Sequence, residues 1–581
     1  MKMSTRFIII LALLAPGGLL ADQLAPILDR SARFHPIATN SGMVVAQDAI
    51  ASSVGATILS NGGNAIDAAV ATGFALAVTL PQAGNLGGGG FMLIHLASRA
   101  RTIAIDYREM APAAAHSTLF QNTDGGVDTT LARFSHRSTG VPGTVAGLVH
   151  ALDLYGSMTL QQVMAPAITL AEDGFEINEA LAYSLSKAQP RLKADTASAR
   201  YFFNHDGSLL KTGDLWKQPD LAKTLTDIAQ QGASGFYRGD LADLIVAEMR
   251  KGGGLITHDD LADYRVVERQ PVTGSFRGYQ IASMPPPSSG GVHLIQMLNI
   301  LEGWDLKSLG HNSGEYLHRL IETMRRAYAD RSEYLGDPDF FPVPVDALTD
   351  KAYAKQLREG IDLQKSSRST DIKPFLALPE ESPQTTHFSV WDQKGNVVSN
   401  TYTLNFSYGS GISVEGGGFL LNNEMDDFSA KPGVPNAYGL VGNKANAIEP
   451  GKRPLSSMTP TIVFRNGKPV MATGSPGGST IINVVLQNIL NKLEFGMNIA
   501  EATAAPRIHH QWLPDTVRVE PGISPDTINI LENMGHQIDT DRHILGRVQA
   551  IAKDKSFLYG VTDPRWPGGA AMPSKERAEE R

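Results

Sequence analysis

The chain has 581 residues, 42% of them hydrophobic, and a formal net charge of -8 at pH 7. This acidic balance argues against a nucleic-acid-binding protein, because phosphate contacts need clustered lysine and arginine. The lack of cysteine in the sequence excludes thiol nucleophiles, iron–sulfur clusters and thiolate zinc sites. Length alone predicts about two to four domains.

The first residues have the pattern of a targeting segment. Lys2 and Arg6 precede an apolar run over 7–14, which Ala-Pro-Gly-Gly follows at 15–18, with a further small residue at Ala21. The run is far shorter than the roughly 20 residues that a membrane span requires. We interpret 1–21 as a signal peptide and expect an exported protein, periplasmic or secreted, without stable membrane insertion. A retained anchor is the alternative. Leu19 stands where a small residue is preferred, so the exact cut after Ala21 stays open.

Helix and strand patterns then follow without a regular rhythm. Residues 64–80 are apolar on nearly all sides, which predicts a buried helix, and apolar spacing predicts another over 315–330. The glycine run 87–90 lacks the motif of a phosphate loop, so close packing or a bend explains it better. Mixed elements of this kind indicate a layered α+β body. Strands are predicted at 91–96, 266–282, 385–403, 461–464 and 518–520.

A boundary is predicted at 364–384, which is polar and punctuated by proline. We expect an exposed, mobile tail there. A hairpin follows: 385–391 alternates, 392–396 reads as its loop, and 397–404 is rich in β-branched residues. Counting outward from Trp391 opposite Val397 pairs Thr385 with Thr403 on one sheet face.

The run 385–409 resembles the signature of γ-glutamyltransferases (glutathione hydrolases), which are N-terminal-nucleophile hydrolases made as one self-cutting precursor. Other segments resemble further blocks of that family, in the family's order. They are 84–92, 106–109, 422–428, 453–458 and 474–479.

The resemblance implies a four-layer αββα sandwich, built jointly by a large piece, 22–384, and a small piece, 385–581. The two pieces would form a heterodimer. The implied activity is hydrolysis of glutathione and other γ-glutamyl amides, and transfer of the γ-glutamyl group to amino acids or peptides. Neither a cofactor nor a metal is implied. The resemblance therefore favours one interleaved body over the several domains that length predicts.

The resemblance also implies the catalytic groups. Thr385 would be the nucleophile, first against the carbonyl of Gln384 and later against the substrate, with its free α-amino group (pKa about 7.7–8.0) as base. Thr403 would position that amine; a cross-strand pair that only stabilises the hairpin is the alternative. Gly477 and Gly478 would donate backbone N–H groups to the oxyanion.

Substrate-binding residues follow from the same blocks. Arg108 would hold the α-carboxylate, together with the hydroxyls of Ser456 and Ser457. A surface ion pair and an ordinary turn are the plain alternatives. Asn405, Glu424 and Asp427 are also assigned to the substrate, the two carboxylates as partners of its ammonium. The acidic cluster could instead be a solvated loop, and some family members carry glutamine where Glu424 stands.

Three further interpretations stay open at this point. Tyr438, in a Pro/Gly-rich loop at 432–438, resembles a lid residue, although an ordinary surface loop would look the same. His387 and the pair at 509–510 do not have the spacing of a metal site. The rival functions are a β-lactam side-chain (glutaryl) acylase of the same superfamily and an uncut, non-catalytic periplasmic binding protein.

Overall fold

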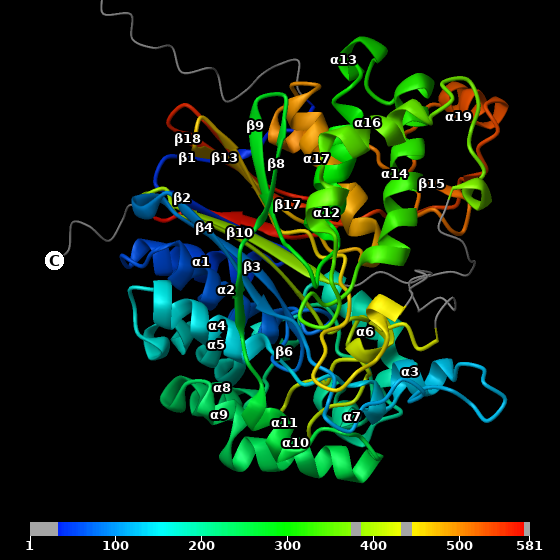
Figure 1. Cartoon of the computed structure of the whole chain (residues 1–581). Coiled ribbons are helices and arrows are strands. Elements are labelled where there is room, and N and C mark those ends of the chain that lie inside the picture. Colours follow the sequence, from blue (N-terminus) through cyan, green and yellow to red (C-terminus); the bar gives the residue numbers. More distant parts are fainter. Residues whose placement is uncertain (1–32, 373–384, 432–443, 575–581) are drawn as a thin grey trace, which may run out of the picture.

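The computed structural model describes residues 33–372, 385–431 and 444–574. In these ranges two seven-stranded sheets lie face to face (Figure 1). The first sheet runs in the order β19 (Gly569–Ala571), β2 (Gly42–Ala46), β10 (Thr386–Asp392), β11 (Val397–Thr403), β3 (Gly89–Leu96), β4 (Arg101–Tyr107) and β7 (Val267–Arg269). The second runs in the order β1 (Ile37–Thr39), β18 (Phe557–Thr562), β17 (Gln549–Asp554), β13 (Lys468–Thr473), β12 (Thr461–Arg465), β9 (Tyr279–Ser283) and β8 (Val272–Phe276).

Alternating side chains explain why the sheets stack. In β2, Val44 and Ala46 join the core that faces the helices, whereas Met43 and Val45 join the core between the sheets. Successive residues of a strand point to opposite faces, so a strand that is apolar throughout must be covered on both. All five residues of β2 are buried. The first sheet is therefore an interior layer.

Helices form the two outer layers. On the first sheet lie α1 (Ala49–Ser60), α2 (Ala65–Thr79) and α4 (Thr144–Tyr155). On the second lie α12 (Gly290–Leu301) and α18 (Ile499–Ala504), with α17 (Ile481–Leu493) and α14 (Gly314–Tyr334) packed against α12. The expected four-layer αββα sandwich is confirmed (Figure 1).

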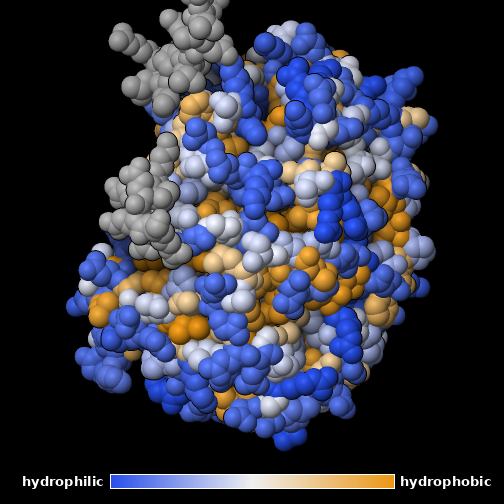
Figure 2. All heavy atoms as spheres, turned by 90° about the vertical axis from the view of Figure 1, so that its left-hand side faces the viewer, coloured by the Kyte–Doolittle hydropathy of each residue, from blue (hydrophilic) through white to orange (hydrophobic). Residues whose placement is uncertain are grey.

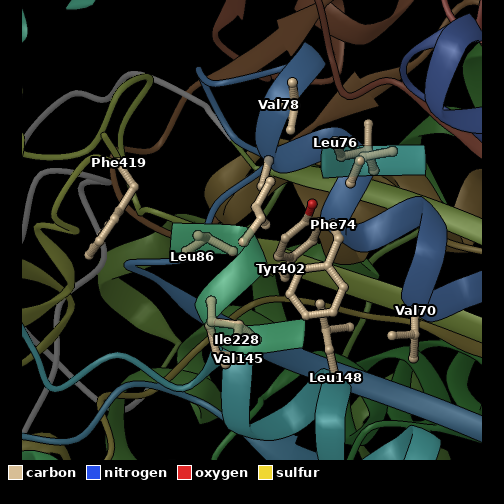
Figure 3. Packing of buried hydrophobic residues seen from close by; sticks show 14 of the residues in the cluster. Val70, Phe74, Leu76, Val78, Leu86, Val145, Leu148, Ile228, Tyr402 and Phe419 are labelled. Atoms are coloured by element: carbon tan, nitrogen blue, oxygen red, sulfur yellow. The ribbon is translucent and has the colours of Figure 1, made fainter. Parts of the chain in front are cut away.

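The helix predicted over 64–80 is α2. Asn64 caps it by accepting hydrogen bonds from the backbone N–H groups of Ile66 and Asp67, and every residue from 65 to 79 is buried. Its Phe74 belongs to the same core as Tyr402 of β11, and the Tyr402 hydroxyl donates to the Gly73 carbonyl at 2.9 Å (Figure 3). This helix thus supports the back of the hairpin at 386–403.

The prediction of several domains from length is wrong. Each sheet takes strands from before residue 373 and from after residue 384: β2, β3, β4 and β7 pair with β10, β11 and β19, and β1, β8 and β9 pair with β12, β13, β17 and β18. Neither part could complete a sheet alone. The chain forms one interleaved body, as the resemblance implied.

Other elements surround the sandwich. The helices α5, α8, α9 and α10 stack below α2 in Figure 1. The remaining helices and strands are α3 (Thr129–Phe134), α5 (Leu160–Asp173), α6 (Glu179–Leu192), α7 (Thr196–Phe202), α8 (Pro219–Gln231), α9 (Ser234–Tyr237), α10 (Gly239–Gly252), α11 (His258–Asp263), α13 (Leu306–Leu309), α15 (Val345–Leu348), α16 (Lys351–Glu359), α19 (Pro525–Asn533), β5 (Phe175–Glu176), β6 (Leu215–Trp216), β14 (Ile508–His509), β15 (Val517–Val519) and β16 (Ile538–Asp539).

The expected tail at 364–384 is only partly described. Its first residues are anchored rather than free: Ser369 is buried, its N–H donates to Asp515 at 2.8 Å, and its carbonyl accepts from the Trp512 indole at 2.8 Å. Gln384, where cleavage is expected, lies outside the described residues, as do Tyr438 and the segment 1–21. No helix within the described ranges is long and apolar enough to cross a bilayer.

Figure 2 shows one face of the molecule, where hydrophobic side chains gather across the middle between hydrophilic zones.

Candidate active site

The site begins at the hairpin of β10 and β11. The predicted register is confirmed, since Trp391 pairs with Val397 and Thr386 with Tyr402. Thr385, one residue before β10, therefore lies beside Thr403, and its hydroxyl donates to the Thr403 hydroxyl at 3.4 Å. Both threonines are buried, with 4% and 3% of their surface exposed.

Glycine allows the neighbouring loop to approach this hairpin. A Cβ added to Gly88 would lie 1.9 Å from the carbonyl oxygen of Thr403, so no other residue fits without displacing β11. Asn85 donates to the same carbonyl at 2.9 Å. The close packing predicted for the glycine run is confirmed, and it fixes the backbone of Thr403 from behind.

Asn405 turns the chain into the site. Its φ of 73° lies in the left-handed region, which asparagine tolerates better than most residues. The Asn405 N–H donates to the Thr403 hydroxyl at 2.8 Å, and its side-chain amide donates to the Asn423 carbonyl at 2.9 Å. The turn thus links the hairpin to the segment that carries Glu424 and Asp427.

Arg108 is buried, not a surface residue. It follows β4, and its guanidinium contacts Glu424 and Asp427 at 2.5 Å each and Glu109 at 3.5 Å. Glu424 and Asp427 stand at the two ends of a single 3-10 turn. The acidic cluster is therefore a buried ion-pair network, so the alternative of a solvated loop is wrong.

A serine pair lies opposite. The loop before α12 fixes the backbone of Ser456 through two hydrogen bonds. The Ser456 N–H donates to the Pro287 carbonyl at 2.9 Å, and the Ser456 carbonyl accepts from the Ser289 N–H at 2.8 Å. Ser457 accepts a hydrogen bond from Arg331 of α14 at 3.1 Å.

Two glycines lead into α17. Gly477 has a φ of 141° and Gly478 a φ of 55°, values that glycine adopts without strain. A short 3-10 turn, Gly478–Thr480, joins them to the N-terminus of α17, whose dipole adds positive potential there.

One pocket gathers most of the predicted residues. Its wall contains Thr385, Thr403, Asn405, Arg108, Glu424, Asp427, Ser456, Ser457 and Gly478. Gly477 is adjacent in sequence but lines a neighbouring hollow.

Comparison with known proteins identifies the family of the chain. The family model described as Gamma-glutamyltranspeptidase matches residues 51–573. The chain belongs to the gamma-glutamyltranspeptidase family. It is 54% identical, over 92% of each chain, to a glutathione hydrolase proenzyme of Escherichia coli, and 46% identical to one of a Pseudomonas species, over 92% of this chain and 95% of that protein.

The similar solved structures include a gamma-glutamyltranspeptidase and a cephalosporin acylase. A gamma-glutamyltranspeptidase of Helicobacter pylori is 50% identical with a TM-score of 0.55, covering 56% of this chain and 93% of that one. A cephalosporin acylase of Bacillus halodurans is 29% identical with a TM-score of 0.83, covering 95% of this chain and 99% of that one. The shared fold therefore does not show whether a protein acts on γ-glutamyl or on cephalosporin substrates. That distinction depends on the residues of the pocket.

The pocket of this family member has more carboxyl groups than cations around Arg108. Burial by itself would lower the pKa of Arg108, but Glu424, Glu109 and Asp427 together raise it. Burial raises the pKa of Glu109 to about 7 and that of Glu424 well above its usual range. One oxygen of Glu424, one of Asp427 and both of Glu109 have no hydrogen-bond donor among the described residues. The cluster is therefore suited to accept a positively charged group.

Sequence reasoning missed two residues of this site. The sequence assigns Glu109 no role in the site, yet it is fully buried beside Arg108. Arg331 is buried in the pocket wall and also donates to the Ser289 hydroxyl at 2.8 Å. A signal for Arg331 existed: it stands seven residues after Met324, in line with the apolar face of the predicted helix and one residue past its predicted end.

The histidines do not assemble a metal site within the described ranges, where no group of three or more histidine or acidic side chains could hold an ion. His387 hydrogen-bonds the hydroxyls of Thr401 and Ser389. His509 and His510 lie near β14 and bond Asn483 and Asp515.

Proposed function

We propose that this protein is a self-processing γ-glutamyltransferase, which hydrolyses glutathione and other γ-glutamyl amides and transfers the γ-glutamyl group to amino acids or peptides. One observation carries the proposal. The hydroxyl pair of Thr385 and Thr403 shares a pocket with a buried cation–carboxylate cluster, centred on Arg108, that matches both charges of a free α-amino acid end. The family match and the names of the relatives support it.

Maturation uses the hydroxyl of Thr385. It attacks the carbonyl carbon of Gln384, the C–N bond to Thr385 breaks, and the acyl group moves from nitrogen to oxygen as an ester. Water then hydrolyses this ester and leaves a free carboxylate on Gln384 and a free α-amino group on Thr385. This step would yield the pieces 22–384 and 385–581 after removal of 1–21.

Turnover repeats the attack on an external substrate. The α-amino group of Thr385 takes the hydroxyl proton, the oxygen attacks the γ-carbonyl, and the amine leaves with a proton. Thr403 positions the attacking groups. Gly477 and Gly478 donate to the oxyanion, an interaction whose loss costs about 3–4 kcal/mol in comparable sites.

The remaining groups hold the amino acid end of the substrate. Ser456, Ser457 and Arg108 bind the α-carboxylate, and Glu424 and Asp427 bind the ammonium. Asn405 completes the wall beside them. We further propose that the protein acts in the periplasm or outside the cell, and that Tyr438 belongs to a lid over the pocket.

The test is a pair of substitutions at the nucleophile. Thr385→Ala should give a single uncut chain without activity toward a γ-glutamyl anilide, whereas Thr385→Ser should still mature, more slowly. A denaturing gel and the anilide assay, with and without glycylglycine, measure both effects. Two bands from Thr385→Ala would contradict the mechanism, and one full-length band from the parent would support the uncut binding protein instead.

A further inference from the structure

A second cavity, of about 350 Å³, adjoins the active site and has a cationic wall. Lys187 and Arg191 reach it from α6, and Arg547 from the segment before β17. Gln82, Ser407 and Trp566 form other parts of the wall, and no described residue of the lining is a carboxylate.

Two chain segments join this cavity to the pocket of Thr385. Asn405 lines that pocket, and Ser407, two residues later, lines the cavity. On the other side, Gly477 and Arg547 share a small hollow, and a Cβ added to Gly477 would lie 3.5 Å from the Cα of Gly546. The cavity therefore adjoins the Thr385 pocket through the segment 405–407, and Arg547 connects it to the hollow beside Gly477.

Arg547 has no counter-ion of its own. Its guanidinium lies 4.2 Å from the centre of the Trp566 ring, and no described carboxylate is within ion-pair distance. Asp563 acts on it from further away, but ion pairs bind that carboxylate to Arg507 and Arg565. Burial lowers the pKa of Arg547 to about 10, which leaves it charged at neutral pH.

Two other donors of the wall are unused. Arg191 donates through one nitrogen to the Ser407 carbonyl, but its buried Nε has no acceptor in the described structure. Gln82 is 1% exposed, and its Nε2 likewise has none. Buried donors without acceptors are rare, and a cavity wall that has three cations and no carboxylate favours an anionic ligand.

We propose that Arg547, Arg191 and Gln82 bind the C-terminal carboxylate of the peptide part of the substrate, in the donor, the acceptor or both. This inference rests on the proposed transfer of γ-glutamyl groups. A dipeptide attached to the γ-carbonyl extends by roughly 3.3–3.6 Å per residue, so its free carboxylate lies well beyond the oxyanion glycines. Two guanidinium groups and an amide present the planar N–H donors that a carboxylate accepts from.

Arg547→Met tests this, because Met keeps an unbranched apolar side chain but removes the guanidinium group, with its charge and its contact with Trp566. For glutathione, KM should rise about 10- to 100-fold while kcat changes by less than about threefold. For the C-terminal amide of glutathione and for γ-glutamyl-p-nitroanilide, which have no such carboxylate, KM should rise by no more than about threefold.

A second arm separates acceptor from donor. With the p-nitroanilide as donor, the preference of the parent for glycylglycine over glycylglycinamide should be lost in Arg547→Met if acceptors use the cavity. Arg465→Met is the matched control, since Arg465 also stacks on a ring, Tyr279, but lines neither cavity. A KM that rises equally for all donors, or no carboxylate-dependent change in either arm, would overturn the inference.

Failure of the proposed function would look different. If the parent protein cleaves no γ-glutamyl donor, the proposed function is refuted. Peptide binding then tests the assignment of the cavity by itself. In that case ligand-detected NMR should show that the parent prefers glycylglycine to its amide and that Arg547→Met does not. Equal binding of both peptides by the two proteins would overturn the cavity assignment.

Discussion

Arg108 shows how a single buried cation can prepare a site for a zwitterion. Three carboxyl groups contact it, more than its charge requires, and several of their oxygens lack donors. Burial raises the pKa of Glu109 and Glu424, which favours their neutral forms in the empty pocket. The proposed substrate ammonium would favour their ionised forms, because a nearby positive charge lowers the pKa of a carboxyl group.

Asp427→Asn tests this balance at the level of one atom. The change keeps the shape and one acceptor oxygen but removes a charge, so glutathione cleavage should fall by about 2–5 kcal/mol in kcat/KM, while glutaryl amides, which lack the α-amino group, should be affected much less. Kinetics with both donors measure the difference.

Asp339→Asn is the control for that experiment, because Asp339 pairs with Arg269 at 2.7 Å, is more than half exposed and lies outside the pocket. It should leave both donors unaffected. If Asp427→Asn cleaves glutathione like the parent, or favours it more strongly over glutaryl amides, Asp427 does not bind the ammonium.

At this scale the sequence predicted the threonine pair because register counting needs only neighbouring residues. It could not predict Arg331 beside Ser457, since 126 positions separate them and no local pattern records the contact. The burial of Glu109 likewise depends on the loop around Gly140, 31 positions later. Gly140 packs so closely on Glu109 that a Cβ added to the glycine would lie 3.0 Å from the Cβ of Glu109.

Among the elements, the glycine loop before β3 controls the position of β11. Gly88→Ala would place a methyl group 1.9 Å from the Thr403 carbonyl, a contact that requires the backbone to move. We expect a loss of about 1–3 kcal/mol in unfolding free energy. Maturation should slow as well, because the shift would separate the Thr385 and Thr403 hydroxyls.

Thermal unfolding and the two-band gel measure these effects. Gly360→Ala is a matched control, since a Cβ there would meet its nearest neighbour at an ordinary 3.5 Å. A variant Gly88→Ala that melts and matures like the parent would mean that the loop does not hold β11.

Elements with a strong local pattern were predictable, and those formed by distant pairing were not. The buried α2 and the 386–403 hairpin have patterns of their own. In contrast β19, Gly-Ala-Ala, has no strand propensity and exists because it pairs with β2, more than 500 residues earlier.

In the whole molecule, buried histidines should make the fold sensitive to acid. Burial lowers the pKa of each of five histidines to about 3 or 4; they are His293, His387, His509, His510 and His536. The unfolded chain, with histidine pKa near 6.5, takes up protons first. Stability present above pH 6.5 is therefore lost as the pH falls toward 3, at up to about 1.4 kcal/mol per pH unit for each histidine.

Chemical denaturation at several pH values checks this. Buried carboxyl groups with raised pKa oppose the trend in part; they include Glu109 (about 7), Asp330 (about 6) and Glu424. His293→Gln should reduce the slope below pH 6.5, whereas His258→Gln, at a half-exposed position, should not. A free energy of unfolding that is constant from pH 6.5 to 4.5 would contradict the assignment.

Because the two sheets are interleaved, the proposed cleavage changes how well an unfolded molecule can refold. Before the cut, one covalent chain brings β2 to β10 and β3 to β11 at the high effective concentration of an intramolecular reaction. After it, the same strands must find each other as separate solutes. A mature enzyme that unfolds in dilute surroundings would thus have no efficient route back, so activation also makes its eventual loss irreversible.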